Sequence, residues 1–217
     1  MIVSTEENKT ANIQLNGTPL SSVKIFSYLG SRITSDGRAT QEISYRLHQA
    51  RVAFNKKSKI FESSNISLDL RKRMLKTLVW SILLYGCETW CIGGSDYNKL
   101  EAFEMWCFRR MLRVSWRDHI TNEEVLSRIK EKRTLSSSIS ERRSRWIGHT
   151  LRHDNLLSTI IEGTIEGKNR PGRPRREYIQ QVIEDHGFSN YTELKRACHN
   201  RQDWKRHCHR LLPTSRF

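Results

Sequence analysis

Hydrophobic residues recur every three or four positions through most of the chain, which is the spacing of an amphipathic helix. The pattern is clearest in two runs, Leu75 to Tyr85 and Leu100 to Trp116, which are joined by a short stretch that holds Gly86. The first run has one apolar side, and the second has apolar residues on one side and arginines on the other. We expect the two runs to be neighbouring helices at the centre of the hydrophobic core.

The beginning of the chain has a different pattern, because residues 11–34 favour β structure. Ile13 and Leu15 alternate with polar residues, and Asn16-Gly17 beside them is the commonest signal for a tight hairpin. Helical spacing then begins near Thr40. The sequence therefore predicts a mainly α fold with a small N-terminal β-hairpin or meander.

Capping residues predict where several helices begin. Thr121 and Glu124 have the spacing of a capping box, Ser67 and Ser95 are placed to cap the two central helices, and Asn190 to cap the last one. The other expected helices run from about residue 40 to 61, from about 135 to 152, and from Tyr178 to a stop at Gly187; the last is expected to continue through Trp204.

These elements divide the chain into three units. Residues 1–38 form the hairpin unit, residues 39–132 a helical bundle, and residues 133–217 a basic C-terminal helical region. Within the last unit, glycine and proline interleaved with basic residues make 154–176 an exposed loop.

The charge balance narrows the class of partner. The chain of 217 residues has 38 Lys and Arg against 23 Asp and Glu, a formal net charge of +15, and its isoelectric point is about 10.0. This excess favours a polyanionic partner and, for nucleic acid, binding driven by counterion release. A basic surface that serves only solubility is the alternative.

The cysteines and the hydropathy predict the compartment. Five cysteines without a close Cys-x-x-Cys pair, and no leading signal peptide, predict a reducing intracellular setting. The longest apolar stretch, Leu78 to Tyr85, is far shorter than the ~20 residues that span a bilayer, so we expect no membrane segment.

His149, His153 and the cysteines and histidines between 198 and 209 could supply zinc ligands, but their spacing is poor, and we expect no metal or other cofactor.

Arginines at helical spacing are the first candidate site. A planar guanidinium binds phosphate through two hydrogen bonds, so rows of arginine can follow a nucleic-acid backbone. The alternative is a solvated helix face paired with Glu101, Glu104 or Glu141. The first row comprises Arg109, Arg110, Arg113 and Arg117, and the second comprises Arg142, Arg143, Arg145 and Arg152. The helix after Thr40 is expected to turn further basic residues outward, namely Arg46, Arg51, Lys56 and Lys59.

The segment Arg170-Pro171-Gly172-Arg173-Pro174-Arg175-Arg176 is the second candidate site. Gly172 lets the backbone approach a groove floor, Pro174 holds the chain extended, and the flanking Arg173 and Arg175 suit a narrow A·T-rich minor groove. The segment resembles an AT-hook core, although Pro171 stands where arginine is usual. A solvated loop or a nuclear-import signal is the alternative.

The tryptophans and one glycine bear on helix packing. The six tryptophans could stack on bases, but most lie next to apolar helix positions, so we expect them in the core or at an interface. Gly148, between Ile147 and His149, predicts that another helix approaches closely.

Several short sequence motifs resemble those of a known family. They are Phe26-Ser27-Tyr28-Leu29-Gly30-Ser31-Arg32-Ile33, Leu83-Leu84-Tyr85-Gly86-Cys87-Glu88-Thr89-Trp90, Leu100-Glu101-Ala102-Phe103-Glu104, Arg109-Arg110-Met111-Leu112, Ser115-Trp116-Arg117-Asp118, Trp146-Ile147-Gly148-His149 and Gly172-Arg173-Pro174-Arg175. Together they resemble the C-terminal part of the polyprotein of non-LTR (LINE-type) retrotransposons, nearest to the RTE/BovB-like endonuclease-reverse transcriptases. They follow the family's order over nearly the whole chain.

The resemblance implies a role for each unit. Phe26, Tyr28, Leu29 and Gly30 would lie in the primer grip, a hairpin at the end of the polymerase palm that supports the primer terminus. The bundle 39–132 would be the thumb, which closes over the template–primer duplex. The rest would be the family's C-terminal nucleic-acid-binding region.

The chemistry of the family needs residues that this sequence does not contain. Polymerisation uses carboxylates that hold two metal ions, among them an aromatic-x-Asp-Asp turn upstream of the primer grip. No Asp-Asp pair occurs in the chain, and the endonuclease domain is absent. We therefore expect a nucleic-acid-binding fragment of an RNA-directed DNA polymerase that is not an enzyme on its own. We expect it in the nucleus more than in the cytoplasm. The alternative is a host-adopted architectural DNA-binding or protein-interaction protein, with the Leu75–Trp116 helices as the protein-binding surface.

Overall fold

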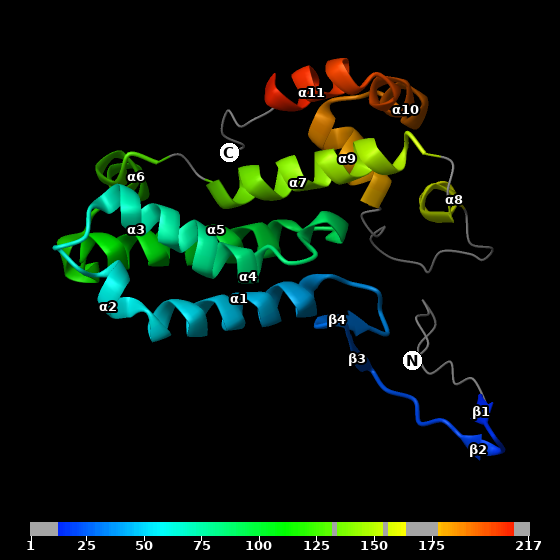
Figure 1. The fold of residues 1–217 in the computed structure, drawn as a ribbon, viewed down its shortest axis with the longest axis horizontal. Helices are drawn as coiled ribbons and strands as arrows, with labels where there is room; N and C mark the ends of the chain where they lie inside the picture. Colours follow the sequence, from blue (N-terminus) through cyan, green and yellow to red (C-terminus); the bar gives the residue numbers. More distant parts are fainter. Residues whose placement is uncertain (1–12, 132–133, 154–155, 164–177, 211–217) are drawn as a thin grey trace.

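The computed structural model describes residues 13–131, 134–153, 156–163 and 178–210. Most of this length is helical, and two small strand pairs lie near the N-terminus (Figure 1), which confirms the predicted fold class. Helices α1, α4 and α5 pack together, α7 lies across α5, and α10 and α11 cover the other side of α7. Within the described ranges, no helix is long and apolar enough to cross a membrane.

The β structure consists of two separate hairpins. Strands β1 (Gln14–Leu15) and β2 (Thr18–Pro19) join through Asn16-Gly17, as predicted, and β3 (Ile25–Tyr28) and β4 (Ser31–Thr34) join through Leu29-Gly30. Both residues of each turn have positive φ, which matches the twist of paired strands. The expected meander is not formed, because β1 and β2 are two residues long and pair only with each other.

Two helices of the bundle begin at capping residues that the sequence predicts. Ser67 Oγ accepts from Leu70 N–H, as predicted. Thr121 Oγ1 accepts from Glu124 N–H, but the predicted capping box is only half formed, because the Glu124 carboxylate accepts from Arg128 instead. The predicted cap at Ser95 is wrong, because the N-cap lies two residues earlier, at extended Gly93. The predicted helix 40–61 is divided at Lys57. The elements here are α1 (Thr40–Lys56), α2 (Ser58–Phe61), α3 (Leu68–Leu75), the π-helical turn η1 (Lys76–Trp80), α4 (Ser81–Leu83), η2 (Cys87–Thr89), α5 (Gly94–Leu112), η3 (Trp116–Asp118) and α6 (Asn122–Ile129).

The C-terminal helices also follow their capping residues, with one exception. Gly187 (φ 69°) follows α9, and Asn190 Oδ1 accepts from Glu193 N–H at 2.9 Å, as predicted. The expected single last helix is divided at Asn200, because its side chain accepts from the N–H groups of Gln202 and Asp203 and begins a new helix. The elements here are α7 (Thr134–Thr150), α8 (Leu156–Glu162), α9 (Tyr178–His186), α10 (Tyr191–His199) and α11 (Arg201–Arg210).

Helix α7 belongs to two hydrophobic cores. Leu135 and Ile139 in its first half pack into the larger core, with side chains from α1 to α6. Ile147 in its second half, and Leu151 just after its end, pack into a smaller core with α9, α10 and α11. The same helix therefore fixes the C-terminal helices against the bundle.

Gly148 lies where α11 crosses α7. A Cβ atom added at Gly148 would lie 2.2 Å from Nε1 of Trp204, and this Nε1 donates to Ser144 O at 2.9 Å. The indole therefore packs directly on the α7 backbone, as the predicted close approach requires.

We predict that Gly148→Ala lowers the free energy of unfolding by ~1–3 kcal/mol, because Trp204 must leave Ser144 to make room. Helix propensity alone predicts the opposite sign, a gain of about 1 kcal/mol. Gly94→Ala is the control, since nothing lies within 4 Å of that position. Urea denaturation followed by circular dichroism measures both variants. Unchanged stability of Gly148→Ala would contradict the packing described here.

His186 is a buried titratable group in the smaller core. Its Nε2 lies 2.9 Å from Ser144 Oγ, and its ring stacks on Trp204. Burial, aided by the nearby charges of His207 and Arg143, lowers the pKa of His186 to about 4. The unfolded chain therefore binds a proton near pH 6.5 that the folded chain does not accept until about pH 4.

This difference in pKa predicts that stability is highest above pH 6.5 and falls as the pH is lowered toward 4. The loss between pH 7 and pH 5 is about 2 kcal/mol. It should shrink in His186→Gln and persist in His48→Gln, which changes an exposed histidine. Urea titrations at the two pH values test this. An equal loss in wild type and His186→Gln would refute the assignment.

Candidate nucleic-acid interface

The β3–β4 hairpin is fastened to α1 by a buried ion pair. Arg46, which is 8% exposed, donates from Nε to Glu42 Oε1 at 2.7 Å and from Nη2 to Gly30 O at 2.5 Å. Glu42 Oε2 accepts from Arg32 N–H at 2.7 Å. The expectation that Arg46 points outward is wrong, because its guanidinium binds the hairpin carbonyl and the buried carboxylate. The spacing of Glu42 and Arg46, four apart, is the sequence signal for this pair.

The tip of this hairpin is held from a second side. Tyr85 donates from its hydroxyl to Leu29 O at 3.0 Å. Leu29 has φ 47°, a conformation that is uncommon for a leucine, and its side chain is 75% exposed. The backbone of the turn is thus fixed while its apolar side chain projects into solvent. The hairpin holds all four residues predicted from the family resemblance, namely Phe26, Tyr28, Leu29 and Gly30.

The hairpins expose an apolar surface. All nine large hydrophobic side chains from Ile13 to Ile33 are exposed. Lys24 and Arg32 add positive charge beside them, whereas Arg38 pairs with Asp36 at 3.8 Å. Large exposed apolar patches often belong to interaction sites, so these hairpin side chains are candidates for contact with a partner.

The solvent side of α1 continues from the hairpin without a carboxylate. The one acidic residue between positions 40 and 61 is Glu42, which is buried with Arg46. The 17 residues of α1 span about 25 Å. We call the exposed residues of this side the acid-free strip. They are Gln41, Ser44, His48, Arg51, Asn55, Lys56 and Lys59.

The first arginine row mainly holds the loop after α5. Arg109 donates from Nη2 to Ile120 O at 2.8 Å and to Asn122 Oδ1 at 2.9 Å. Arg113 donates from Nε to Glu62 O at 2.8 Å, and Arg110 pairs with the Glu62 carboxylate at 3.4 Å. Arg109 is therefore placed to order this loop, and nucleic-acid contact by the more exposed Arg110, Arg113 and Arg117 stays a prediction.

The second arginine row does not form one outward face. Arg143 is 2% exposed; its Nη1 lies 2.9 Å from Asp185 Oδ2, and its Nη2 donates to Trp90 O at 2.7 Å. Its predicted outward position is wrong, because a carboxylate and a loop carbonyl distant in sequence enclose it. The other three members are engaged as well: Arg142 with Leu84 O and Glu88, Arg145 with Glu141, and Arg152 with Cys198 O.

Two further predictions concern residues that the structure describes only in part or not at all. The AT-hook-like residues Arg170, Gly172, Arg173, Pro174, Arg175 and Arg176 lie outside the described residues, so that site stays a prediction. In the part of the chain that is described, no three metal-ligating side chains come together. The five cysteines are free thiols, and burial raises the pKa of both Cys87 and Cys198 to about 12, which keeps these thiols protonated.

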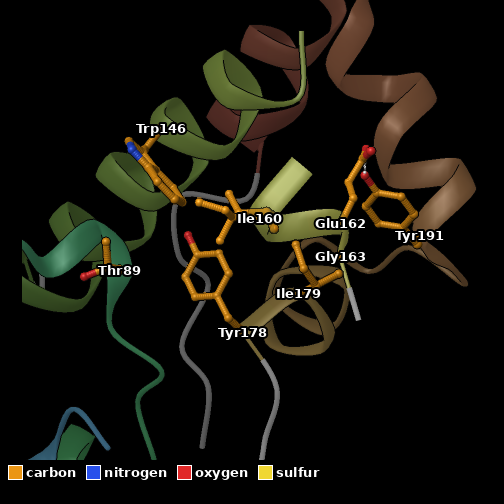
Figure 2. A pocket seen from close by; sticks show the side chains of 9 residues that line it. Thr89, Trp146, Ile160, Glu162, Gly163, Tyr178, Ile179 and Tyr191 are labelled. Atoms are coloured by element: carbon orange, nitrogen blue, oxygen red, sulfur yellow. Dashed lines mark hydrogen bonds between the residues drawn. The ribbon is translucent and has the colours of Figure 1, made fainter. Parts of the chain in front are cut away.

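A pocket of about 490 Å³ lies beside α8 and α9 (Figure 2), and apolar side chains such as Trp146, Ile160 and Ile179 line it. Its polar groups are already engaged. The Tyr191 hydroxyl donates to Glu162, Lys195 pairs with the same carboxylate at 2.6 Å, and Tyr178 donates to Glu88 O at 2.8 Å. These contacts engage the side chains of Glu162, Tyr178 and Tyr191, and we assign the pocket no ligand.

The helices Leu75–Trp116, which were an alternative protein-binding surface, use their apolar sides inside the protein. Leu75, Leu83, Leu100 and Met111 are buried in the larger core. In this region only Tyr85 and Trp116 are exposed large hydrophobic residues.

Comparisons with known protein families, with curated proteins and with solved structures found no match to this chain. The family resemblance therefore rests only on the short sequence motifs described above.

We predict that Tyr85→Phe loosens the hairpin without disturbing the core, because it removes only the hydrogen bond to Leu29 O from a residue that is 48% exposed. Losing a hydrogen bond of about 1 kcal/mol should speed amide exchange in β3 and β4 about fivefold. Exchange in α5 should not change. Tyr45→Phe is the control, since it keeps the ring that lies under Arg32. Unchanged hairpin exchange in Tyr85→Phe would count against this anchoring.

Proposed function

We propose that the chain is the nucleic-acid-binding C-terminal part of a reverse transcriptase of the non-LTR retrotransposon type, and that it grips a template–primer duplex. The observation that carries the proposal is the fixed β3–β4 hairpin followed by the acid-free strip. The strip is about 25 Å long, which corresponds to roughly seven base pairs of a duplex at 3.4 Å per step. Arg51, Lys56 and Lys59 on it are exposed and, among the residues described, form no ion pair with a carboxylate.

The proposed contact is mainly with phosphate. Cations on a helix surface neutralise the backbone whatever the sequence, so binding should tolerate many sequences and weaken with salt. Leu29, at the hairpin tip, offers an apolar contact to the terminal base pair or sugar.

The proposal does not include catalysis by this chain. Joining nucleotides by the two-metal mechanism requires grouped carboxylates, and the aspartates of this sequence, at positions 36, 69, 96, 118, 154, 185 and 203, are all separated from one another. The predicted nuclear location belongs to the same proposal and rests on the basic segment 168–176.

A second candidate function, a host-adopted protein-interaction or architectural protein, is favoured by a different observation. The exposed apolar side chains from Ile13 to Ile33 suit a protein partner as well as a nucleic acid. Only the first candidate predicts tight, strongly salt-dependent retention of duplex in filter binding.

The test is the salt dependence of binding to a short RNA–DNA hybrid duplex. Replacing Arg51, Lys56 and Lys59 together by alanine should reduce the slope of log K against log salt by about three units, because three phosphate contacts are lost.

The matched control removes the same charge elsewhere, by replacing Arg128, Arg145 and Arg206 with alanine. These three are exposed, and each pairs with a carboxylate on its own helix. Their loss should leave the slope unchanged. An equal reduction in both triple variants, or a salt-independent affinity of the wild type, would contradict the proposed interface.

A further inference from the structure

The loop between α5 and α6 presents an unusually exposed tryptophan. Trp116, in the short helix η3, is 79% exposed, whereas Trp80, Trp90 and Trp204 are buried. Tryptophan is among the side chains that gain most from burial, so an indole left in solvent contributes little to the stability of the fold and keeps that gain available for a ligand.

This loop is rigidly built around the indole. Ser115 N–H donates to Asp118 Oδ2 at 2.7 Å, and Ser115 Oγ accepts from Arg117 N–H at 3.3 Å. Arg113 and His119, on either side, both have positive φ, a conformation that costs free energy in residues other than glycine.

Contacts from outside the loop hold both of its ends. Arg109 binds Ile120 O beyond the loop, and Arg71 donates to Met111 O before it at 2.7 Å. The exposed position of Trp116 is therefore fixed and does not result from a loose segment.

The charge around Trp116 indicates what it would contact. The Arg117 guanidinium lies 5.7 Å from the centre of a Trp116 ring, and Arg113 lies three residues before it. The nearest carboxylate in sequence, Asp118, is committed to the backbone of Ser115. A flat aromatic surface flanked by cations suits a ligand that is both aromatic and anionic, which is the chemistry of a nucleotide.

The loop that holds Trp116 contacts the chain just beyond one end of the acid-free strip. The strip ends at Lys59 in α2, and the next residues of the chain include Glu62, whose carbonyl oxygen accepts from Arg113. Figure 1 shows α2 and the β3–β4 hairpin at opposite ends of α1, so the contact between Arg113 and Glu62 joins the loop that holds Trp116 to the end of the strip opposite the hairpin.

We propose that Trp116 stacks on an unpaired base where a single strand leaves the duplex held by the strip. This inference rests on the proposed function and adds a preference for a duplex with a single-stranded extension. Bases inside a duplex have both faces covered by their neighbours, so an indole beside the duplex gains from an unpaired base that extends beyond the paired region.

The test compares two probes, a blunt RNA–DNA hybrid and the same hybrid with a single-stranded overhang. Trp116→Ala should lose affinity for the overhang probe on the order of tenfold to a hundredfold and keep its affinity for the blunt probe. Trp116→Phe, which retains a stacking ring, should keep most of the preference. The overhang probe should also quench tryptophan fluorescence in the wild type and do so less in Trp116→Phe.

The outcomes separate this proposal from the one on which it rests. Salt-dependent binding of the blunt probe, with no effect of Trp116→Ala on the overhang probe, overturns only the stacking proposal. Equal losses on both probes also overturn it. If the wild type binds neither probe, the proposed function fails and the stacking proposal fails with it. Dimerisation of the wild type that Trp116→Ala abolishes would show that the indole contacts a second copy of the chain, and would overturn the proposal as well.

Discussion

Arginine side chains bound to backbone carbonyl oxygens hold this helical protein together at its loops. The last carbonyls of a helix have no partner within the helix, and several here accept from a guanidinium instead. Arg71 binds Phe61 O at the end of α2 and Met111 O near the end of α5, and Arg152 binds Cys198 O near the end of α10. A guanidinium suits this role because it stays charged and presents several donors in a fixed plane.

This use of arginine changes how the net charge is interpreted. A balance of +15 does not mean that all of the excess faces a partner, because Arg46, Arg109 and Arg143 are engaged inside the protein. The proposed interface is therefore smaller than the sequence suggests, and it consists of the β3–β4 hairpin and the acid-free strip.

The sequence predicts the elements well where local chemistry decides them. Ser67, Thr121 and Asn190 begin helices because a side-chain oxygen and a nearby N–H group are enough for a cap. The close helix contact at Gly148 can also be predicted, since a glycine among large residues in a helix indicates close packing. The break at Asn200 follows the same capping rule, but helical spacing on both sides conceals it.

Contacts between distant residues explain most of what the sequence does not reveal. Periodicity cannot distinguish an outward Arg143 from one that meets Asp185, which lies 42 residues away. The position of Leu29 depends on Tyr85, 56 residues later in the chain, and Trp116 is exposed because Arg109 and Arg71 fix the loop around it. Of the candidate site, the sequence therefore predicts the hairpin residues, and the acid-free strip becomes visible only once Glu42 is seen to be buried with Arg46.

Acetylation of lysines, with and without bound RNA–DNA hybrid duplex, tests the central claim most directly. Mass spectrometry gives the rate at each lysine. Lys56 and Lys59, on the strip, should be acetylated more slowly in the complex, whereas Lys99 and Lys195, which pair with Asp96 and Glu162, should keep the rates of the free protein. Protection of Lys99 and Lys195 with none at Lys56 and Lys59 would contradict the proposed path of the duplex.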